Sequence, residues 1–204
     1  MDNNTLVQNY QGPLPDNYHS LVSREYKVSY ALELAELARD RGLTPVAVSV
    51  TGSTLRGQDH EDSDVDALVL VEDKDFKATT WYNDVQVQSF GTYVEKLSTS
   101  VPYVEFLNSP FMVVDPRYRP YLMSQVVNPL VLHSHAQRFV GHVMARLGTV
   151  GNTYRKCFAT WYLINHGTPL VPREFMDEQN APAEFWHWLE ESNENYLEAQ
   201  NRHN

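Results

Sequence analysis

Two aspartates separated by one residue, Asp64 and Asp66, are the side chains in this sequence best suited to chemistry. They open an apolar run that predicts a strand, and alternate side chains on a strand point to the same face. On that geometry both carboxylates face one way, with their Cα atoms roughly 6.6 Å apart. Because Mg²⁺ prefers carboxylate oxygens, water and substrate phosphates, the pair predicts a divalent-metal site for Mg²⁺, or alternatively Mn²⁺.

Gly52 and Ser53 end the preceding predicted strand, and ten residues separate them from the aspartates. A glycine lets the backbone approach a phosphate because it has no side chain, and a serine can donate from both its hydroxyl and its amide. The two motifs together predict a site for a phosphorylated ligand.

Three predicted strands position these residues. Alternating valines indicate a strand over 46–51, and the run 65–72 is apolar on both faces beyond its first two positions, which is typical of a buried central strand. A third strand is predicted over 85–90. Before them, apolar residues at helical spacing predict a helix over 23–41 that Gly42 can end.

The chain after Phe90 has helical patterns interrupted by prolines, and the layout therefore predicts an α+β fold. We expect a small mixed sheet flanked by helices, followed by a helical C-terminal part, with a boundary near Asp115. The expected helices cover 90–99, 102–108, 117–127, 134–147, 153–166 and 182–199.

The segment 52–66, GSTLRGQDHEDSDVD, resembles nucleotidyltransferases of the DNA polymerase β superfamily. Small bacterial members often have G-S-R-A-x-G, a polar loop and then S-D-x-D. This chain matches at the same spacing with Gly52, Ser53, Arg56, Gly57, Ser63, Asp64 and Asp66. Thr54 departs from the pattern, because an arginine often follows the serine. The resemblance is firm over 46–90.

Two later segments are similar to parts of an uncharacterised bacterial and phage branch of that superfamily. VPYVEFLNSP carries Glu105, and YRKCFATWYLINHGTPLVP predicts a helix with Arg155 and Lys156 at its basic start. An ordinary amphipathic helix is the alternative explanation of the second segment.

The resemblance implies transfer of a nucleoside monophosphate from a nucleoside triphosphate (NTP) to an acceptor, with release of pyrophosphate. It assigns Mg²⁺ binding to Asp64 and Asp66, and nucleotide binding to Gly52, Ser53, Arg56 and Lys156. On this interpretation residues 1–115 form a nucleotidyltransferase core, and residues 116–204 form a helical region that closes over the cleft. The acceptor stays open between a small molecule, a protein side chain and an RNA end.

The family normally has a third carboxylate on a neighbouring strand. Here that strand, DVQVQSF, has only glutamines and a serine as interior polar residues, and its one acid is Asp84 at its start. Either Asp84 completes the catalytic set, or Glu105 substitutes, or the protein binds a nucleotide without turning it over. The same two acids are the candidates for the general base; alternatively the metal alone makes the acceptor acidic enough.

The formal net charge of −10 argues against a protein coated by nucleic acid, because such binding needs Lys and Arg to neutralise phosphates. The stretch 116–173, however, has seven basic residues and no acidic one. This pattern indicates a surface for an anionic partner such as a nucleotide or an RNA end, or basic residues scattered over helix faces.

Composition also bears on the compartment. No apolar run reaches the roughly 18 residues that a membrane span needs, the first residues lack a secretory pattern, and the single cysteine, Cys157, fits a reducing compartment. We expect a cytoplasmic protein without membrane contact, in which Cys157 is a buried structural thiol.

Other interpretations of the same residues remain. Asp62, Asp64 and Asp66 match an EF-hand loop, but Ala67 stands where that loop needs glycine, and the flanks predict strands. The acidic segment could also be a simple turn. Two further function classes are a catalytically impaired relative that regulates by binding nucleotide or RNA, and a protein-binding partner such as an antitoxin.

Overall fold

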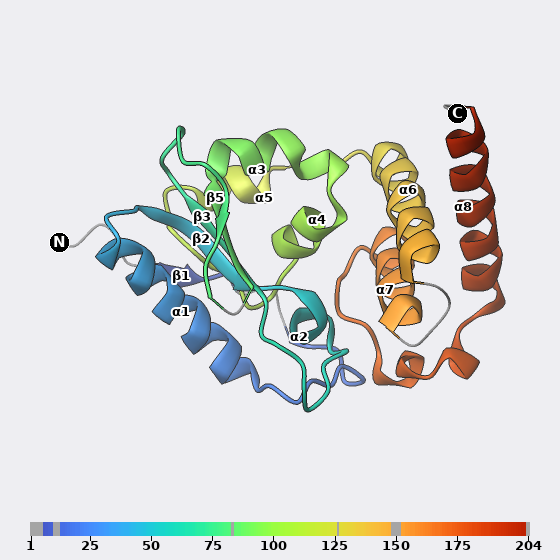
Figure 1. Ribbon diagram of the computed structural model, residues 1–204. Coiled ribbons are helices and arrows are strands. Elements are labelled where there is room, and N and C mark those ends of the chain that lie inside the picture. The colour runs from blue at the N-terminus through green and yellow to red at the C-terminus, as the bar shows by residue number, and fades with distance from the viewer. Residues whose placement is uncertain (1–5, 10–12, 83, 126, 148–151, 203–204) are drawn as a thin grey trace.

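The computed structural model describes all residues except 1–5, 10–12, 83, 126, 148–151 and 203–204. A mixed sheet lies in one half of the molecule, and the C-terminal helices lie in the other (Figure 1). Among the described residues the strands of the sheet follow the order β1-β6-β2-β3-β5-β4. The central strand β3 pairs antiparallel with β2 and parallel with β5. The strands are β1 (Val7–Gln8), β2 (Pro45–Val50), β3 (Ala67–Val71), β4 (Thr79–Thr80), β5 (Val85–Ser89) and β6 (Val113–Val114).

Helix α1 (Arg24–Asp40) covers one face of the sheet (Figure 1). It begins where the Ser23 side chain accepts a hydrogen bond from the Tyr26 amide, and it ends before Gly42, whose φ of +76° suits glycine. Alternation along β3 explains the packing, because Val69 and Val71 contact α1 while Leu68 and Leu70 point to the opposite face.

The remaining helices lie on that opposite face or beyond it (Figure 1). They are α2 (Gly52–Arg56), α3 (Phe90–Lys96), α4 (Val101–Leu107), α5 (Arg119–Met123), α6 (Pro129–Leu147), α7 (Asn152–His166) and α8 (Ala183–Asn201), with short 3₁₀ turns at Leu97–Thr99, Arg173–Met176 and Glu178–Asn180. No helix of the described residues is long and apolar enough to cross a lipid bilayer.

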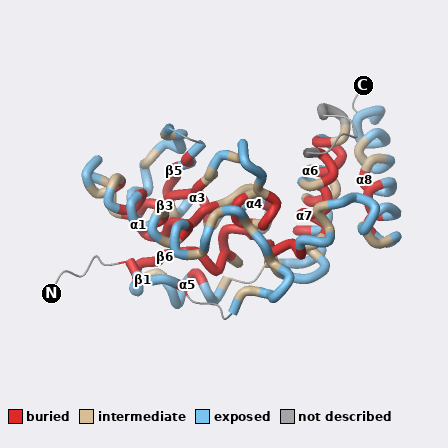
Figure 2. The backbone as a smooth tube through the Cα atoms, turned by 90° about the horizontal axis from the view of Figure 1, so that it is seen from below, coloured by how far each residue is buried: buried red, intermediate tan, exposed pale blue. Residues whose placement is uncertain are grey.

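One hydrophobic core joins the sheet to the C-terminal helices. It contains Leu70 of β3, Phe106 of α4, Phe158 of α7 and Phe185 of α8, all with no exposed surface. Figure 2 shows the buried positions running from the sheet into the facing sides of α6, α7 and α8. The domain boundary near Asp115 stays a prediction, and apolar packing extends across it.

The α+β class, the mixed sheet and the helical C-terminal part are confirmed. Several boundaries differ from expectation. Helix α6 begins at Pro129 instead of residue 134, since proline is tolerated in a first helical turn, and α5 is shorter than the expected 117–127. The expected polar loop after Ser53 starts instead as α2.

The structure also tests the expectation for Cys157 and the expected placement of the two aspartates within a strand. Cys157 is buried, and burial raises the pKa of its thiol to about 12, as expected of a structural residue. The strand expected to start at residue 65 begins at Ala67, so the two aspartates lie just before β3 and not within it.

Replacement of Phe158 by alanine tests the shared core. Its ring contacts those of Tyr154, Trp161, Phe175 and Phe185, so we expect a loss of about 3–5 kcal/mol in the free energy of unfolding. Urea unfolding followed by both circular dichroism and tryptophan fluorescence should stay a single transition.

The control is Tyr82→Ala, which removes an aromatic ring that is 55% exposed and should cost about 0.5 kcal/mol or less. Two separate transitions in the unchanged protein would contradict a shared core.

Candidate active site

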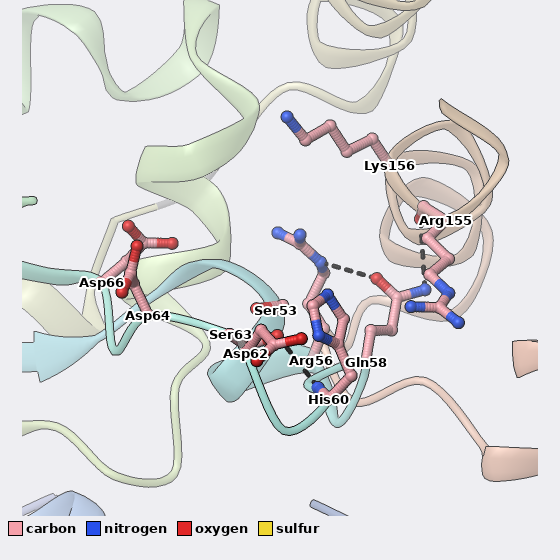
Figure 3. Close-up of a pocket in the computed structure, with 10 residues that line it drawn as sticks. All are labelled: Ser53, Arg56, Gln58, His60, Asp62, Ser63, Asp64, Asp66, Arg155 and Lys156. Atoms are coloured by element: carbon pink, nitrogen blue, oxygen red, sulfur yellow. Dashed lines mark hydrogen bonds between the residues drawn. The ribbon is translucent and has the colours of Figure 1, made fainter. Parts of the chain in front are cut away.

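A cavity of about 380 Å³ lies where the segment after β2, the segment before β3 and the start of α7 meet. Five residues expected to act on a nucleotide line it together: Ser53, Arg56, Asp64, Asp66 and Lys156. Figure 3 shows the two aspartates side by side at one end and the basic side chains towards the other. The paired carboxylates and the cationic side chains therefore lie at different ends of the cavity.

Gly52 makes the close approach of the two motifs sterically feasible. Its φ of +66° is a conformation that side-chain-bearing residues rarely adopt, and a Cβ there would lie 2.1 Å from Asp66 Oδ2. The Thr51 amide donates to the Asp66 carbonyl (2.9 Å), which extends the pairing of β2 with β3 beyond the strand ends. The turn at Gly52 thus lies directly against the Asp66 carboxylate.

The two aspartates differ in environment. Asp64 is exposed and Asp66 half-buried, and the Thr54 hydroxyl donates to the Asp64 carbonyl (3.3 Å). Burial raises the pKa of Asp66, and the negative charges of Asp84 and Asp64 raise it further, while Arg56 and Lys156 act in the opposite direction. A bound cation would relieve this accumulation of negative charge.

The donor set at this end fits a hard divalent cation. No group of three or more His, Cys, Asp or Glu side chains arranged to hold a metal occurs in the described part of the chain. A pair of carboxylates nevertheless suits Mg²⁺, which usually keeps several waters and takes further oxygens from substrate phosphates.

Asp84 lies beside Asp66 at the head of the neighbouring strand. The parallel register pairs Ala67 with Val85, which brings the preceding acids of the two strands together, and Asp84 itself has a φ of +55° and is exposed. It does not line the cavity. Deeper in β5, Gln88 is buried and its Oε1 accepts a hydrogen bond from the Tyr103 hydroxyl (2.5 Å), so that amide oxygen already has a partner.

Glu105 is occupied by an ion pair with Arg56. Arg56 Nη1 lies 3.2 Å from Glu105 Oε2, and the side chains of Arg56 and Glu105 are only 12% and 5% exposed. Burial raises the pKa of Glu105, while Arg56 acts in the opposite direction. Because Arg56 satisfies this buried carboxylate, Glu105 holds the guanidinium in place and is not free to bind a metal.

A hydrogen-bonded chain connects Arg56 to α7. Its Nε donates to Gln58 Oε1 (2.9 Å), and Gln58 Nε2 donates to the Arg155 carbonyl (3.1 Å) (Figure 3). The first turn of α7 therefore lies against the cavity, with Arg155 and Lys156 on its lining. Sequence analysis missed Gln58 and the Arg56–Glu105 pair, because both depend on contacts between residues far apart in the chain.

A comparison with known families agrees with this geometry. The sequence model of the nucleotidyltransferase domain matches residues 32–112. This segment, 81 of the chain's 204 residues, is similar to nucleotidyltransferase domains. The match runs from within α1 to just before β6, so it includes Gly52, Ser53, Asp64 and Asp66, and it is consistent with the polymerase β superfamily. Lys156 lies outside it. No curated protein matches the chain significantly.

The Arg56–Glu105 pair yields a stability prediction. Glu105→Ala leaves a guanidinium at a largely buried position without its counter-ion, and we expect a loss of about 3–5 kcal/mol in the free energy of unfolding. The matched control is Glu198→Ala, which breaks the exposed pair with Arg202 and should cost about 0.5 kcal/mol or less in the same urea titration. Equal costs for the two variants would show that burial of the first pair has no energetic consequence.

Gly52→Ala tests the steric role of the turn. The added methyl group would displace the Asp66 carboxylate, so calorimetry should detect no binding of a magnesium–NTP complex. Gly42→Ala is the control, because Gly42 has a similar φ of +76° but open space around it. The control should lose about 1 kcal/mol of stability from backbone strain and bind normally; normal binding by both variants would contradict the steric role.

Proposed function

We propose that this protein transfers a nucleoside monophosphate from an NTP to an acceptor and releases pyrophosphate, with Mg²⁺ as the metal. The observation that carries the proposal is the cavity itself, which has paired aspartates at one end and basic side chains at the other. A triphosphate has the complementary shape and charge, because its phosphates need both a metal and cationic donors.

Each side chain has a role in this proposal. Asp64 and Asp66 would hold the metal, which supplies neutralising charge at the triphosphate oxygens. Ser53 donates its hydroxyl and amide to a phosphate, and the backbone at Gly52 leaves room for that approach. Arg56 is held by Glu105, so its guanidinium needs little reorganisation to bind a phosphate.

The first turn of α7 completes the phosphate site in this proposal. Lys156 carries an exposed ammonium on the cavity lining, and it would bind the phosphates that leave as pyrophosphate. Since α7 follows the matched domain, the helical C-terminal part would contribute directly to nucleotide binding.

Asp84 is the candidate general base. A base must be reachable by the attacking group of the acceptor, and Asp84 is exposed beside Asp66. Glu105 does not meet this requirement, because it is buried and bound to Arg56.

The missing interior acid on β5 favours a second candidate function. Gln88 occupies that strand and its amide oxygen is bound by Tyr103. A protein with this arrangement could bind a nucleotide without turning it over and act as a regulator. Calorimetry with magnesium and each NTP, combined with an assay for pyrophosphate, separates the two functions, because a regulator binds without pyrophosphate release.

The double variant Asp64→Asn/Asp66→Asn tests the proposed reaction. Neutral amides bind a hard cation weakly, so we expect loss of pyrophosphate release and of label transfer from α-labelled NTP. The assay supplies small-molecule and RNA fractions of a cell extract as acceptors.

The matched control is Asp73→Asn/Asp75→Asn, a second pair of aspartates separated by one residue that is exposed just beyond β3. It should keep full activity. Undiminished transfer by the Asp64/Asp66 variant would refute the assignment of the two carboxylates.

A further inference from the structure

Helix α2 carries two of the proposed phosphate-binding residues but has only five residues. A helix of that length has little stability of its own, because the cost of its first turn is not recovered by propagation. Its position must therefore come from contacts made by other segments. The face that bears Ser53 and Arg56 borders the cavity, while its last carbonyls point to the N-terminal segment and to the chain after α7.

The carbonyls at the end of α2 are bound by segments distant in sequence. The Tyr18 hydroxyl donates to the Leu55 carbonyl (3.1 Å) and lies 3.3 Å from the Thr54 carbonyl. The Val171 amide donates to the Arg56 carbonyl (3.0 Å). These bonds replace the partners that a longer helix would supply from its own next turn.

The residue that ends α2 also lies against Tyr18 and its neighbour. A Cβ at Gly57 would lie 2.5 Å from the His19 carbonyl oxygen and 2.8 Å from the Tyr18 ring, and Gly57 has a φ of +74°. An isolated antiparallel β-bridge pairs Tyr18 with Pro172. Tyr18 therefore links the N-terminal segment to the chain after α7 at the point where α2 ends.

A buried lysine lies behind this tyrosine. Lys27 of α1 is 1% exposed, and its Nζ donates to the Tyr18 hydroxyl (2.6 Å). The ammonium lies 4.5 Å from the centre of the Phe111 ring and 5.0 Å from that of Tyr18. Burial lowers the pKa of Lys27 to about 8, while Asp59 acts in the opposite direction, so the amine carries a proton at neutral pH.

Burial raises the pKa of the Tyr18 phenol, so this group keeps its proton. It can then accept from Lys27 and donate to Leu55 at the same time. A buried ammonium destabilises the folded state unless a hydrogen-bond acceptor lies beside it. Among the contacts of the described residues, the rings around Lys27 supply no acceptor other than the Tyr18 hydroxyl. The free-energy cost of a Lys27 ammonium without an acceptor therefore favours the position in which the Tyr18 hydroxyl faces it.

We propose that Tyr18 and Lys27 are positioning residues for the nucleotide site: together they hold α2 at the orientation in which Ser53 and Arg56 reach the phosphates. This role rests on the proposed function. Neither residue touches the cavity, and both act through the backbone of α2. The pair accounts for a charged side chain buried on α1, which the reaction itself does not use.

The test is binding of magnesium complexes of ATP, GTP, CTP and UTP, measured by calorimetry, together with urea unfolding of each variant. Tyr18→Phe leaves Leu55 and Lys27 without their partner, and we expect the dissociation constant to rise about tenfold. Tyr26→Phe is the matched control, because Tyr26 is 52% exposed on α1 and should bind as the unchanged protein does.

A double-variant cycle isolates the pair. Lys27→Met removes the ammonium but leaves the tyrosine hydroxyl, so it should weaken binding less than Tyr18→Phe. The combined variant should bind no more weakly than Tyr18→Phe alone, because the two residues act through one contact. If Tyr18→Phe fails to fold, the dissociation constant of Lys27→Met is compared with that of Lys77→Met, which alters an exposed lysine.

The outcomes are distinguishable. No binding by the unchanged protein would overturn the proposed function, and the positioning role with it. Normal binding by the unchanged protein and by folded Tyr18→Phe would overturn the positioning role alone. A lower urea midpoint for Tyr18→Phe with an unaltered dissociation constant would likewise assign the pair to stability and not to the nucleotide site.

Discussion

Repulsion between neighbouring carboxylates is the physical constraint on which the rest of this structure depends. Asp64, Asp66 and Asp84 meet at one end of the sheet, and Asp66 is half-buried, so its charge is poorly solvated. Such an arrangement is costly unless something holds the backbone in place and a cation compensates the charge. The fold holds the backbone in place directly, because β3 pairs with a strand on each side.

The same constraint explains the surrounding elements. Parallel pairing of β3 with β5 aligns the acids that precede each strand, and the turn at Gly52 brings α2 against them. Arg56 is fixed by Glu105 at the other side of the cavity, and Gln58 connects this region to α7. The site is thus assembled from the sheet, a five-residue helix and the C-terminal helices, and the shared hydrophobic core keeps these parts together.

The sequence was most informative where function depends on local spacing. Alternation and helical periodicity predicted β2, β3, β5 and α1, because each is long enough to bury a repeating pattern of side chains. The two-residue strands β1, β4 and β6 carry no detectable period. The fixed spacing within 52–66 brought together Ser53, Arg56, Asp64 and Asp66, which line the cavity, whereas the ion pair of Arg56 with Glu105 and the contact of Tyr18 with Leu55 depend on tertiary packing.

The central claim is that paired aspartates and the Gly52–Ser53 turn bind opposite sides of one metal–triphosphate complex. A crystal structure with magnesium and a non-hydrolysable NTP measures this directly. The account predicts a metal ion coordinated by Asp64 and Asp66, with phosphates against Ser53, Arg56 and Lys156. A triphosphate bound away from this cavity, or both carboxylates without metal in the bound complex, would contradict it.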